Sequence, residues 1–465
     1  MICLILTAFL FFILKLPIIL NDPFFVGDSG VRLDHADRIV YIWQSHVWQP
    51  FLQSHIWVLN KCMAPFWAFK LVPVIYSTIA AFFLGLIVYR IFKHTWRGLL
   101  LAIILMACFS FQPLIKFLSL NLYQEILDTA LLYALLYGGA LKLEKRWPLL
   151  ILASCALLNR ETAFFYLLAI TLINFKKIIS DREYVLAFCW LWLFPVCWFS
   201  YLIFKLKLNL SWPWFVTKVL PSVKVHLSSW SSLCSAFHTS GTQYFALVLV
   251  ALMIVTALIL KKTKGVVFKK GSFESDFMVF SLLSLAIIYS AYLLLDPWQC
   301  TFGNERMLMP LLPHLFIWAG IIFSKIDECP APIHFFLRII LILALLSLIR
   351  GQAWSNKNQW DNKEMRFYYS MQQIRKKFPP DQKPLVCILG KDYYDITKPF
   401  IASTLYMRRE FILPGEGYFF DPCNMMIAPV NFTLGEPRMV KYDTFKLSSS
   451  TYTVYLRDGY PFRRF

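Results

Sequence analysis

Charged residues and glycine are both scarce in this chain of 465 residues. Asp, Glu, Lys and Arg together make up 16% of the sequence, against about 25% in soluble proteins. The 17 glycines exclude a collagen-like fibre, and the 58% of hydrophobic residues excludes a disordered chain. No soluble fold has enough interior to bury this much apolar surface. The composition therefore predicts a mainly α-helical, polytopic membrane protein.

The sequence also lacks the motifs of soluble nucleotide and metal chemistry. It contains no phosphate-binding loop, no dinucleotide fingerprint, no CxxC pair and no HExxH. Its eight histidines lack the spacing of metal ligands, so no metal site is predicted. The net charge of +19 would suggest nucleic-acid binding in a soluble protein. In a membrane protein the same excess indicates cytoplasmic loops and anionic lipid, and no nucleic-acid partner is predicted.

Long apolar runs predict about eleven membrane segments in a helical bundle. One run, 147–175, is interrupted by Asn159-Arg160-Glu161-Thr162. We expect it to form a short helical hairpin with Arg160 and Glu161 near its tip. The other nine runs are 1–20, 71–92, 98–115, 126–141, 184–204, 243–260, 277–295, 306–323 and 333–349.

Basic residues beside these segments predict their direction, because short basic loops belong in the cytoplasm. Four basic groups lie on the same side of the membrane only if the run 147–175 enters the membrane and returns to the side from which it came. The N-terminus is then cytoplasmic, and the chain after Arg350 is outside. The first segment has no basic n-region and no cleavage site, so it is expected to be retained. The basic groups are Arg90, Lys93 and Arg97; Lys142, Lys145 and Arg146; Lys176, Lys177 and Arg182; and Lys261, Lys262, Lys264, Lys269 and Lys270.

The chain is expected to have two domains, a membrane domain at 1–350 and an extracytoplasmic α/β domain at 351–465. The second domain contains no spanning run. Cys387 and Cys423 both lie in it, and whether they form a disulfide stays open. Its predicted elements are an amphipathic helix at 365–378, ended by Pro379-Pro380, and strands at 385–389 and 451–456.

The long first outer loop, 21–67, carries candidate catalytic acids. Asp28 lies in Gly27-Asp28-Ser29-Gly30, where the flanking glycines allow a ligand to approach closely. Asp34 and Asp37 lie on one face of an amphipathic helix predicted to start at Val31. The alternative is that Asp28 or Ser29 caps this helix while the other charges face water.

Other ionisable residues are predicted to gather at the same membrane face. Ionisable residues within or beside the membrane indicate a functional site by default. The alternative is that Arg160 with Glu161, or Glu305 with Arg306, pairs across neighbouring helices. The residues are Glu125 and Asp128 at the start of the fourth segment, Arg160 and Glu161 at the hairpin tip, and Asp296, Glu305 and Arg306 around a late outer loop.

This pattern resembles the GT-C superfamily of integral-membrane glycosyltransferases, in particular bacterial lipopolysaccharide core transferases and protein mannosyltransferases. The resemblance covers essentially the whole chain, as architecture more than as one tight motif. This chain has Asp-Ser where many members have two adjacent acids. The corresponding positions are the acidic loop motif at Asp28, the acid entering the fourth segment at Glu125, the polar hairpin tip at Arg160, and the basic residue of a Pro-rich late helix at Arg306.

The resemblance implies an inverting hexosyltransferase of the bacterial inner membrane. Its donor would be a polyprenyl-phosphate sugar, and its acceptor a lipid, glycan or protein of the cell envelope on the extracytoplasmic face. Asp28 would deprotonate the acceptor, and Arg306, with Arg160 as second candidate, would hold the donor phosphate. Glu125 would orient a sugar hydroxyl or act as a second carboxylate. Glu161, Asp34 and Asp37 are further substrate-binding candidates, and a divalent cation between carboxylate and phosphate stays an open alternative.

Two other classes of protein also have many spans and charges near the membrane. An O-antigen ligase or polymerase shares the substrates and the location, but typically carries its large outer loop between late spans. A secondary transporter needs discontinuous helices and usually internal symmetry. The long first loop and the outer domain favour the transferase over both.

Overall fold

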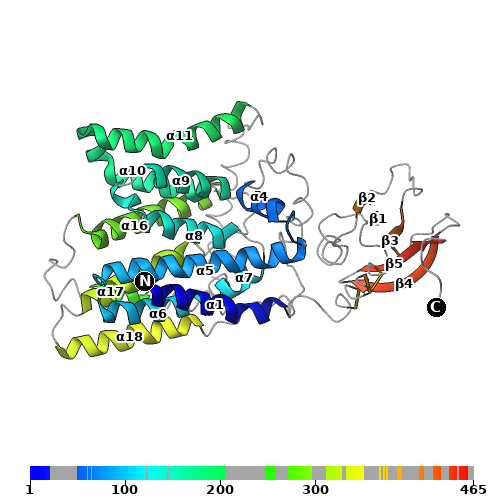
Figure 1. Cartoon of the computed structure of the whole chain (residues 1–465), viewed down its shortest axis with the longest axis horizontal. Coiled ribbons are helices and arrows are strands. Elements are labelled where there is room, and N and C mark those ends of the chain that lie inside the picture. Colours follow the sequence, from blue (N-terminus) through cyan, green and yellow to red (C-terminus); the bar gives the residue numbers. More distant parts are fainter. Residues whose placement is uncertain are drawn as a thin grey trace. The chain divides into compact units, whose positions relative to one another are not determined.

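The computed structural model divides into two compact units, a helical unit and a sheet unit (Figure 1). The described residues of the helical unit lie between 1 and 349, and those of the sheet unit between 366 and 458. The structure describes residues 1–20, 50–59, 61–63, 65–121, 124–143, 146–160, 162–204, 248, 250–257, 271–295, 310–326, 331–349, 366–367, 370–371, 373–374, 385–389, 408–412, 423–430, 439–447 and 450–458.

The helical unit is a bundle of apolar helices whose long members lie side by side with roughly aligned axes (Figure 1). Among the described residues, α5, α10, α11 and α16 each contain a stretch long and apolar enough to cross a membrane, and α1, α6, α9, α17 and α18 contain shorter ones. The protein is therefore an integral membrane protein, and the count of eleven segments stays a prediction. The elements are α1 (Ile2–Leu20), α4 (Pro50–Leu59), α5 (Pro65–Ile91), α6 (Trp96–Phe111), α7 (Pro113–Leu120), α8 (Gln124–Tyr137), η1 (Ala140–Lys142), α9 (Arg146–Asn159), α10 (Thr162–Ser180), α11 (Arg182–Phe204), α16 (Phe273–Leu295), α17 (Leu311–Ile326) and α18 (Ala331–Ile349).

The prediction of one continuous segment at 98–115 is wrong, because the helix breaks between α6 and α7. Gln112 caps α7, its Oε1 accepting a hydrogen bond from the backbone N of Ile115 at 2.8 Å. Pro113 follows as the first residue of α7. Proline has no backbone N–H with which to continue α6, and its ring fits the first turn of a new helix.

One further predicted segment differs from the structure in where it ends, and another divides as predicted. The segment predicted at 126–141 stops as α8 at Tyr137, and Gly139 has φ of 88°, a left-handed conformation that ends helices. The run 147–175 does divide into two helices, α9 and α10, as predicted. Arg160 lies in the break between them.

Three of the basic connections meet at one end of the helical unit, which we call the basic end. Arg90 Nη1 donates to the carbonyl oxygen of Tyr137 at 3.3 Å, so α5 and α8 end side by side. Asn174 Nδ2 donates to the carbonyl oxygen of Leu141 at 2.9 Å, which brings the last turns of α10 to η1. The basic residues of these connections whose side chains the structure describes are Arg90, Lys93, Arg97, Lys142, Lys176, Lys177 and Arg182. The fourth basic group, 261–270, lies outside the described residues. The opposite end, where α8 and α10 begin, is called the site end.

A lysine is buried inside the helical unit. Lys15 in α1 is 3% exposed, and its Nζ donates to Ser77 Oγ in α5 at 2.8 Å and to Ser119 Oγ in α7 at 3.5 Å. A polar group in an apolar interior is costly unless it is hydrogen-bonded. The two serines therefore offset the burial of Lys15 and tie three helices together.

The sheet unit contains a five-stranded mixed sheet with strand order β2-β1-β3-β5-β4. β1 is parallel to β2 and β3, and β5 is antiparallel to β3 and β4. The strands predicted at 385–389 and 451–456 are confirmed as β1 and β5, whereas sequence reasoning missed the other three. The strands are β1 (Leu385–Leu389), β2 (Arg408–Ile412), β3 (Met425–Pro429), β4 (Met439–Leu447) and β5 (Ser450–Arg457).

One helical face covers part of this sheet. The described residues within 365–378 are helical, in agreement with the predicted amphipathic helix. Phe367, Met371 and Ile374, which fall on one helical face, are fully buried in a cluster with side chains of β1, β3, β4 and β5. Helix and sheet thus share one hydrophobic core, which makes the unit a small α/β fold.

Cys387 and Cys423, whose pairing the sequence left open, form a disulfide. Cys387 lies in β1 and Cys423 just before β3, with their Cα atoms 5.8 Å apart. Both side chains are fully buried, in a second cluster that includes Leu389, Met426 and Met439. The bond therefore joins β1 to the chain just before its parallel neighbour β3.

Removing this disulfide is expected to destabilise the sheet unit. In a Cys387→Ala/Cys423→Ala variant the unfolding free energy should fall by about 3–4 kcal/mol, because the bond closes a loop with a sequence separation of 36. Denaturant-dependent protease cleavage of the sheet unit in the full-length protein measures the change. Cys62→Ala, which removes an exposed free cysteine, is the control and should have no effect. Equal midpoints for the double variant and the parent would contradict the prediction.

Candidate functional site

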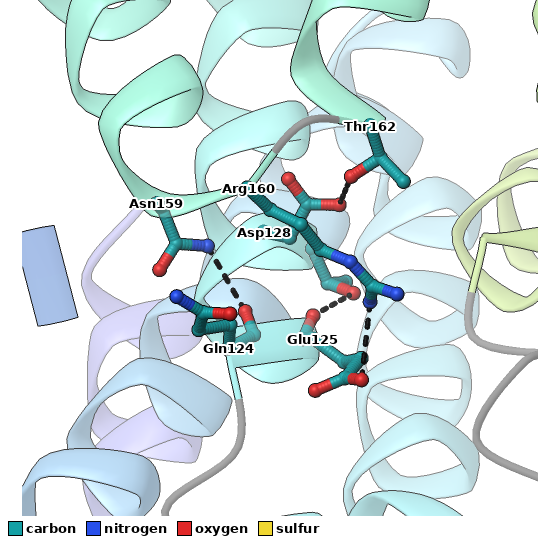
Figure 2. Close-up of polar contacts among 7 residues, drawn as sticks. Gln124, Glu125, Asp128, Asn159, Arg160 and Thr162 are labelled. Carbon is teal, nitrogen blue, oxygen red and sulfur yellow. Dashed lines mark hydrogen bonds and ion pairs between the residues drawn. The ribbon is translucent and has the colours of Figure 1, made fainter. Parts of the chain in front are cut away.

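A cluster of buried polar side chains lies at the site end, where the first turn of α8 meets the break between α9 and α10 (Figure 2). Glu125 and Asp128 are three residues apart, so they share one face of α8. Each is only 5% exposed. Carboxylates are rarely buried to this degree unless they are paired, so their partners decide what the cluster can do.

Glu125 forms an ion pair with Arg160. Arg160 Nη1 lies 3.2 Å from Glu125 Oε1, and the two side chains are 11% and 6% exposed. Figure 2 shows the Arg160 side chain extending from the α9–α10 break toward the first turn of α8. The position of Glu125 in that first turn also favours its negative charge, because a helix N-terminus is partially positive.

Two further hydrogen bonds join the same two regions. Thr162, the first residue of α10, donates through Oγ1 to Asp128 Oδ2 at 2.7 Å. Asn159, the last residue of α9, donates through Nδ2 to the carbonyl oxygen of Gln124 at 3.0 Å. Asn159 is fully buried and Thr162 is 2% exposed. The start of α8 and the hairpin tip are therefore held in one geometry by an ion pair and two hydrogen bonds.

The structure brings together two of the site residues predicted from sequence, Glu125 and Arg160. One predicted alternative was that Arg160 pairs with Glu161, whereas the ion pair in the described residues is with Glu125. The other predicted site residues, Asp28, Asp34, Asp37, Glu161 and Arg306, lie outside the described residues.

Sequence reasoning assigned no role to three members of the cluster. Asn159 and Thr162 were visible only as polar residues interrupting an apolar run. Asp128 was predicted to gather with the other ionisable residues, but without a role of its own. The signal for Asp128 was its three-residue spacing from Glu125, which places both acids on one helical face. For Asn159 and Thr162 the sequence indicated a break in the helix but no partner.

The cluster combines an anion-binding group with groups that accept hydrogen bonds. A guanidinium carries five N–H donors in a planar fork and holds carboxylates and phosphates well. A carboxylate accepts hydrogen bonds from hydroxyl groups, including those of sugars. Within the part of the chain that the structure describes, no three His, Cys, Asp or Glu side chains gather closely enough to hold a metal ion. The chemistry available here is binding of phosphate and hydroxyl groups at the edge of a membrane bundle.

Comparisons with known proteins give a structural likeness but no family. No protein-family model matches the sequence, and no curated protein matches it. Among solved structures, the chain is similar to the crystal structure of ArnT from Cupriavidus metallidurans in the apo state. The two are 10% identical, with a TM-score of 0.40, over 98% of this chain and 97% of that chain. A likeness of this degree assigns no role to any residue.

Proposed function

We propose that this chain is a membrane glycosyltransferase that moves a sugar from a polyprenyl-phosphate donor to an acceptor of the cell envelope on the extracytoplasmic face. The observation that carries the proposal is the buried cluster of Glu125, Asp128 and Arg160 at one end of an apolar helical bundle. Ionisable groups are expensive in a membrane and are retained there mainly for function. A guanidinium beside carboxylates suits a ligand that carries both a phosphate and sugar hydroxyls.

Each of the two units carries a feature that bears on its side of the membrane, and that of the helical unit supports an extracytoplasmic position for the site end. The basic end carries exposed residues such as Arg90, Lys93 and Lys177, which favour the cytoplasm. The disulfide between Cys387 and Cys423 favours an oxidising compartment for the sheet unit, outside the cytoplasm. On that face the donor must be linked to lipid, which agrees with the lack of nucleotide-binding motifs.

The reaction we propose is a single displacement at the anomeric carbon. Asp28 takes the proton of the acceptor hydroxyl, and the acceptor oxygen forms a bond to this carbon. The bond from the same carbon to the phosphate oxygen breaks, and polyprenyl phosphate leaves with the electron pair. Arg306 and Arg160 bind the phosphate and stabilise the charge that it gains.

The ion pair adjusts the role proposed for Glu125. Its carboxylate holds the Arg160 guanidinium at 3.2 Å, so we assign it as a positioning residue for Arg160. Asp128 holds the start of α10 through Thr162, which follows Arg160 by two residues, and we assign it as a second positioning residue for Arg160.

A donor-specific assay tests this function. Purified full-length protein in liposomes is given radiolabelled polyprenyl-phosphate mannose, glucose or galactose together with a bacterial envelope extract. We expect the label of one of these donors to move to the extract, with no transfer from the corresponding nucleotide sugars. Transfer from a polyprenyl-diphosphate oligosaccharide instead would favour the ligase or polymerase class. Uptake of label without any transfer would favour a transporter, and either result would overturn the proposal.

A further inference from the structure

A buried polar cluster lies between α16 and α17, and the proposed reaction does not use it. Its members are Ser281 and Ser284 of α16 and His314 of α17, and all three are fully buried. Ser284 is the central residue of α16, about 17 Å from each end at a rise of 1.5 Å per residue. Because α16 is long and apolar enough to cross a membrane, the cluster lies at a depth where an unsatisfied polar group is costly.

Aromatic side chains surround the imidazole ring of His314. The ring centroids of Phe277 and Phe280 in α16 lie 5.9 and 5.6 Å from that of the imidazole. The ring centroid of Tyr166 in α10 lies 6.2 Å from it. Phe277 and Phe280 are fully buried and Tyr166 is 2% exposed. Bulk solvent therefore does not reach the imidazole, and its nitrogen atoms depend on partners inside the bundle.

The hydrogen bonds of the cluster determine which imidazole nitrogen carries the proton. Ser284 Oγ donates to the carbonyl oxygen of Ser281 at 3.2 Å, so the proton of this hydroxyl is already used. The contact between Ser284 Oγ and His314 Nε2 at 3.5 Å then requires the N–H to be on Nε2. A charged imidazolium is costly at this depth, so the ring is neutral and Nδ1 is a hydrogen-bond acceptor.

Two polar atoms of the cluster indicate a ligand. Within the part of the chain that the structure describes, neither His314 Nδ1 nor Ser281 Oγ has a hydrogen-bond partner. Ser281 and Ser284 follow Phe277 by four and seven residues, so both serines share the face of α16 that meets the imidazole. Nδ1 needs a donor, and the Ser281 hydroxyl needs an acceptor. A ligand that both donates and accepts hydrogen bonds matches this pair of atoms.

We propose that the cluster binds an ordered water molecule. One O–H of this water donates to His314 Nδ1, and its oxygen accepts a hydrogen bond from Ser281 Oγ. Buried waters in proteins bridge polar groups that would otherwise be unsatisfied. An apolar ligand would satisfy neither atom, and a charged ligand would be costly at this depth. The water joins α16 to the first turn of α17, and the inference uses none of the proposed transferase chemistry.

Radiolytic labelling of the full-length protein in detergent, in water enriched in ¹⁸O, tests the site. Hydroxyl radicals formed from a bound water oxidise the side chains beside it, so Phe277 and Phe280 are expected to gain ¹⁸O. Phe367 and Phe445, whose ring centroids lie 5.1 Å apart in the apolar core of the sheet unit, are the internal control and should stay unlabelled. Peptide mass spectrometry measures both pairs. Labelling of Phe277 and Phe280 no higher than that of the control pair would overturn the proposal.

A double variant tests which groups hold the water. His314→Phe/Ser281→Ala removes both partners, so labelling of the two α16 phenylalanines should fall to the level of the control pair. Ser154→Ala should label as the parent does, because Ser154 Oγ donates to the carbonyl oxygen of Leu150 at 2.7 Å within its own helix. Ser281→Ala alone removes only a hydroxyl and should also lower the labelling, which keeps the test decisive if the double variant folds poorly. Labelling that persists in both variants would show that other groups hold the water, and the proposed site would be wrong.

Discussion

Replacing Arg160 by methionine is expected to lower the free energy of unfolding by about 3–5 kcal/mol, because it leaves the Glu125 carboxylate buried without its ion-pair partner. The change is measured by thermal or denaturant unfolding of the purified protein in detergent. Arg366→Met is the matched control, since Arg366 pairs with Asp443 at 3.1 Å with side chains 68% and 36% exposed. An exposed pair contributes at most about 1 kcal/mol, so the control should unfold close to the parent.

A double variant separates the structural role of this pair from its role in activity. In Glu125→Leu/Arg160→Met both charges are gone, and replacing a buried ion pair by apolar side chains of similar size is often neutral or stabilising. The double variant should therefore recover most of the stability lost in Arg160→Met. Its kcat/KM for the polyprenyl-phosphate donor should still fall about 10- to 100-fold, because one charge-assisted hydrogen bond to phosphate is lost.

The kinetic pattern decides between the two roles. If the phosphate contact is made in both the ground state and the transition state, its loss raises KM for the donor. If the contact is made only in the transition state, its loss lowers kcat. A double variant with parental stability and parental kcat/KM would show that the pair only holds the helices together. The role proposed for Arg160 in donor binding would then be wrong.

Asp28→Asn is expected to lower kcat for sugar transfer by about 10²- to 10⁴-fold, the usual contribution of a positioned general base. Asparagine has nearly the same shape as aspartate and forms hydrogen bonds, but it cannot take the proton of the acceptor hydroxyl. Donor KM should therefore change little. The measurement is transfer of label in the liposome assay, at matched protein amounts and with melting temperature as a check on folding.

Asp181→Asn is the control for this variant. Asp181 is exposed at the basic end, and its Oδ1 accepts a hydrogen bond from the backbone N of Glu183 at 2.9 Å, a contact that asparagine can also make. It should transfer sugar as the parent does. Unchanged kcat in Asp28→Asn would remove Asp28 as the base and leave another acid of the first loop, Asp34 or Asp37, as the next candidate.

The strands of the sheet unit show where sequence patterns stop being informative. β1 reads Leu-Val-Cys-Ile-Leu and was predicted, because its apolar run is bounded by Gly390. β4 was missed because its register shifts between Lys441 and Asp443, which disturbs the alternation of inward and outward side chains. β3 reads Met-Met-Ile-Ala-Pro, with little β-branched character and a terminal proline, so its sequence alone does not indicate a strand.

Composition and hydrophobic runs were sufficient to predict that this is a membrane protein. They also predicted the helical hairpin with its break near Arg160 and the clustering of basic residues at one end. Each of these features depends on residues close together in the chain. The partner of Arg160 could not be found in this way. Glu125 lies on α8 and Arg160 in the break between α9 and α10, and their contact depends on how α8 packs against these two helices. The same holds for the buried Lys15, whose hydroxyl partners come from α5 and α7. Burial makes an unpaired charge costly, so charged residues in an apolar bundle need partners, but only the packing of the helices determined which residues those are.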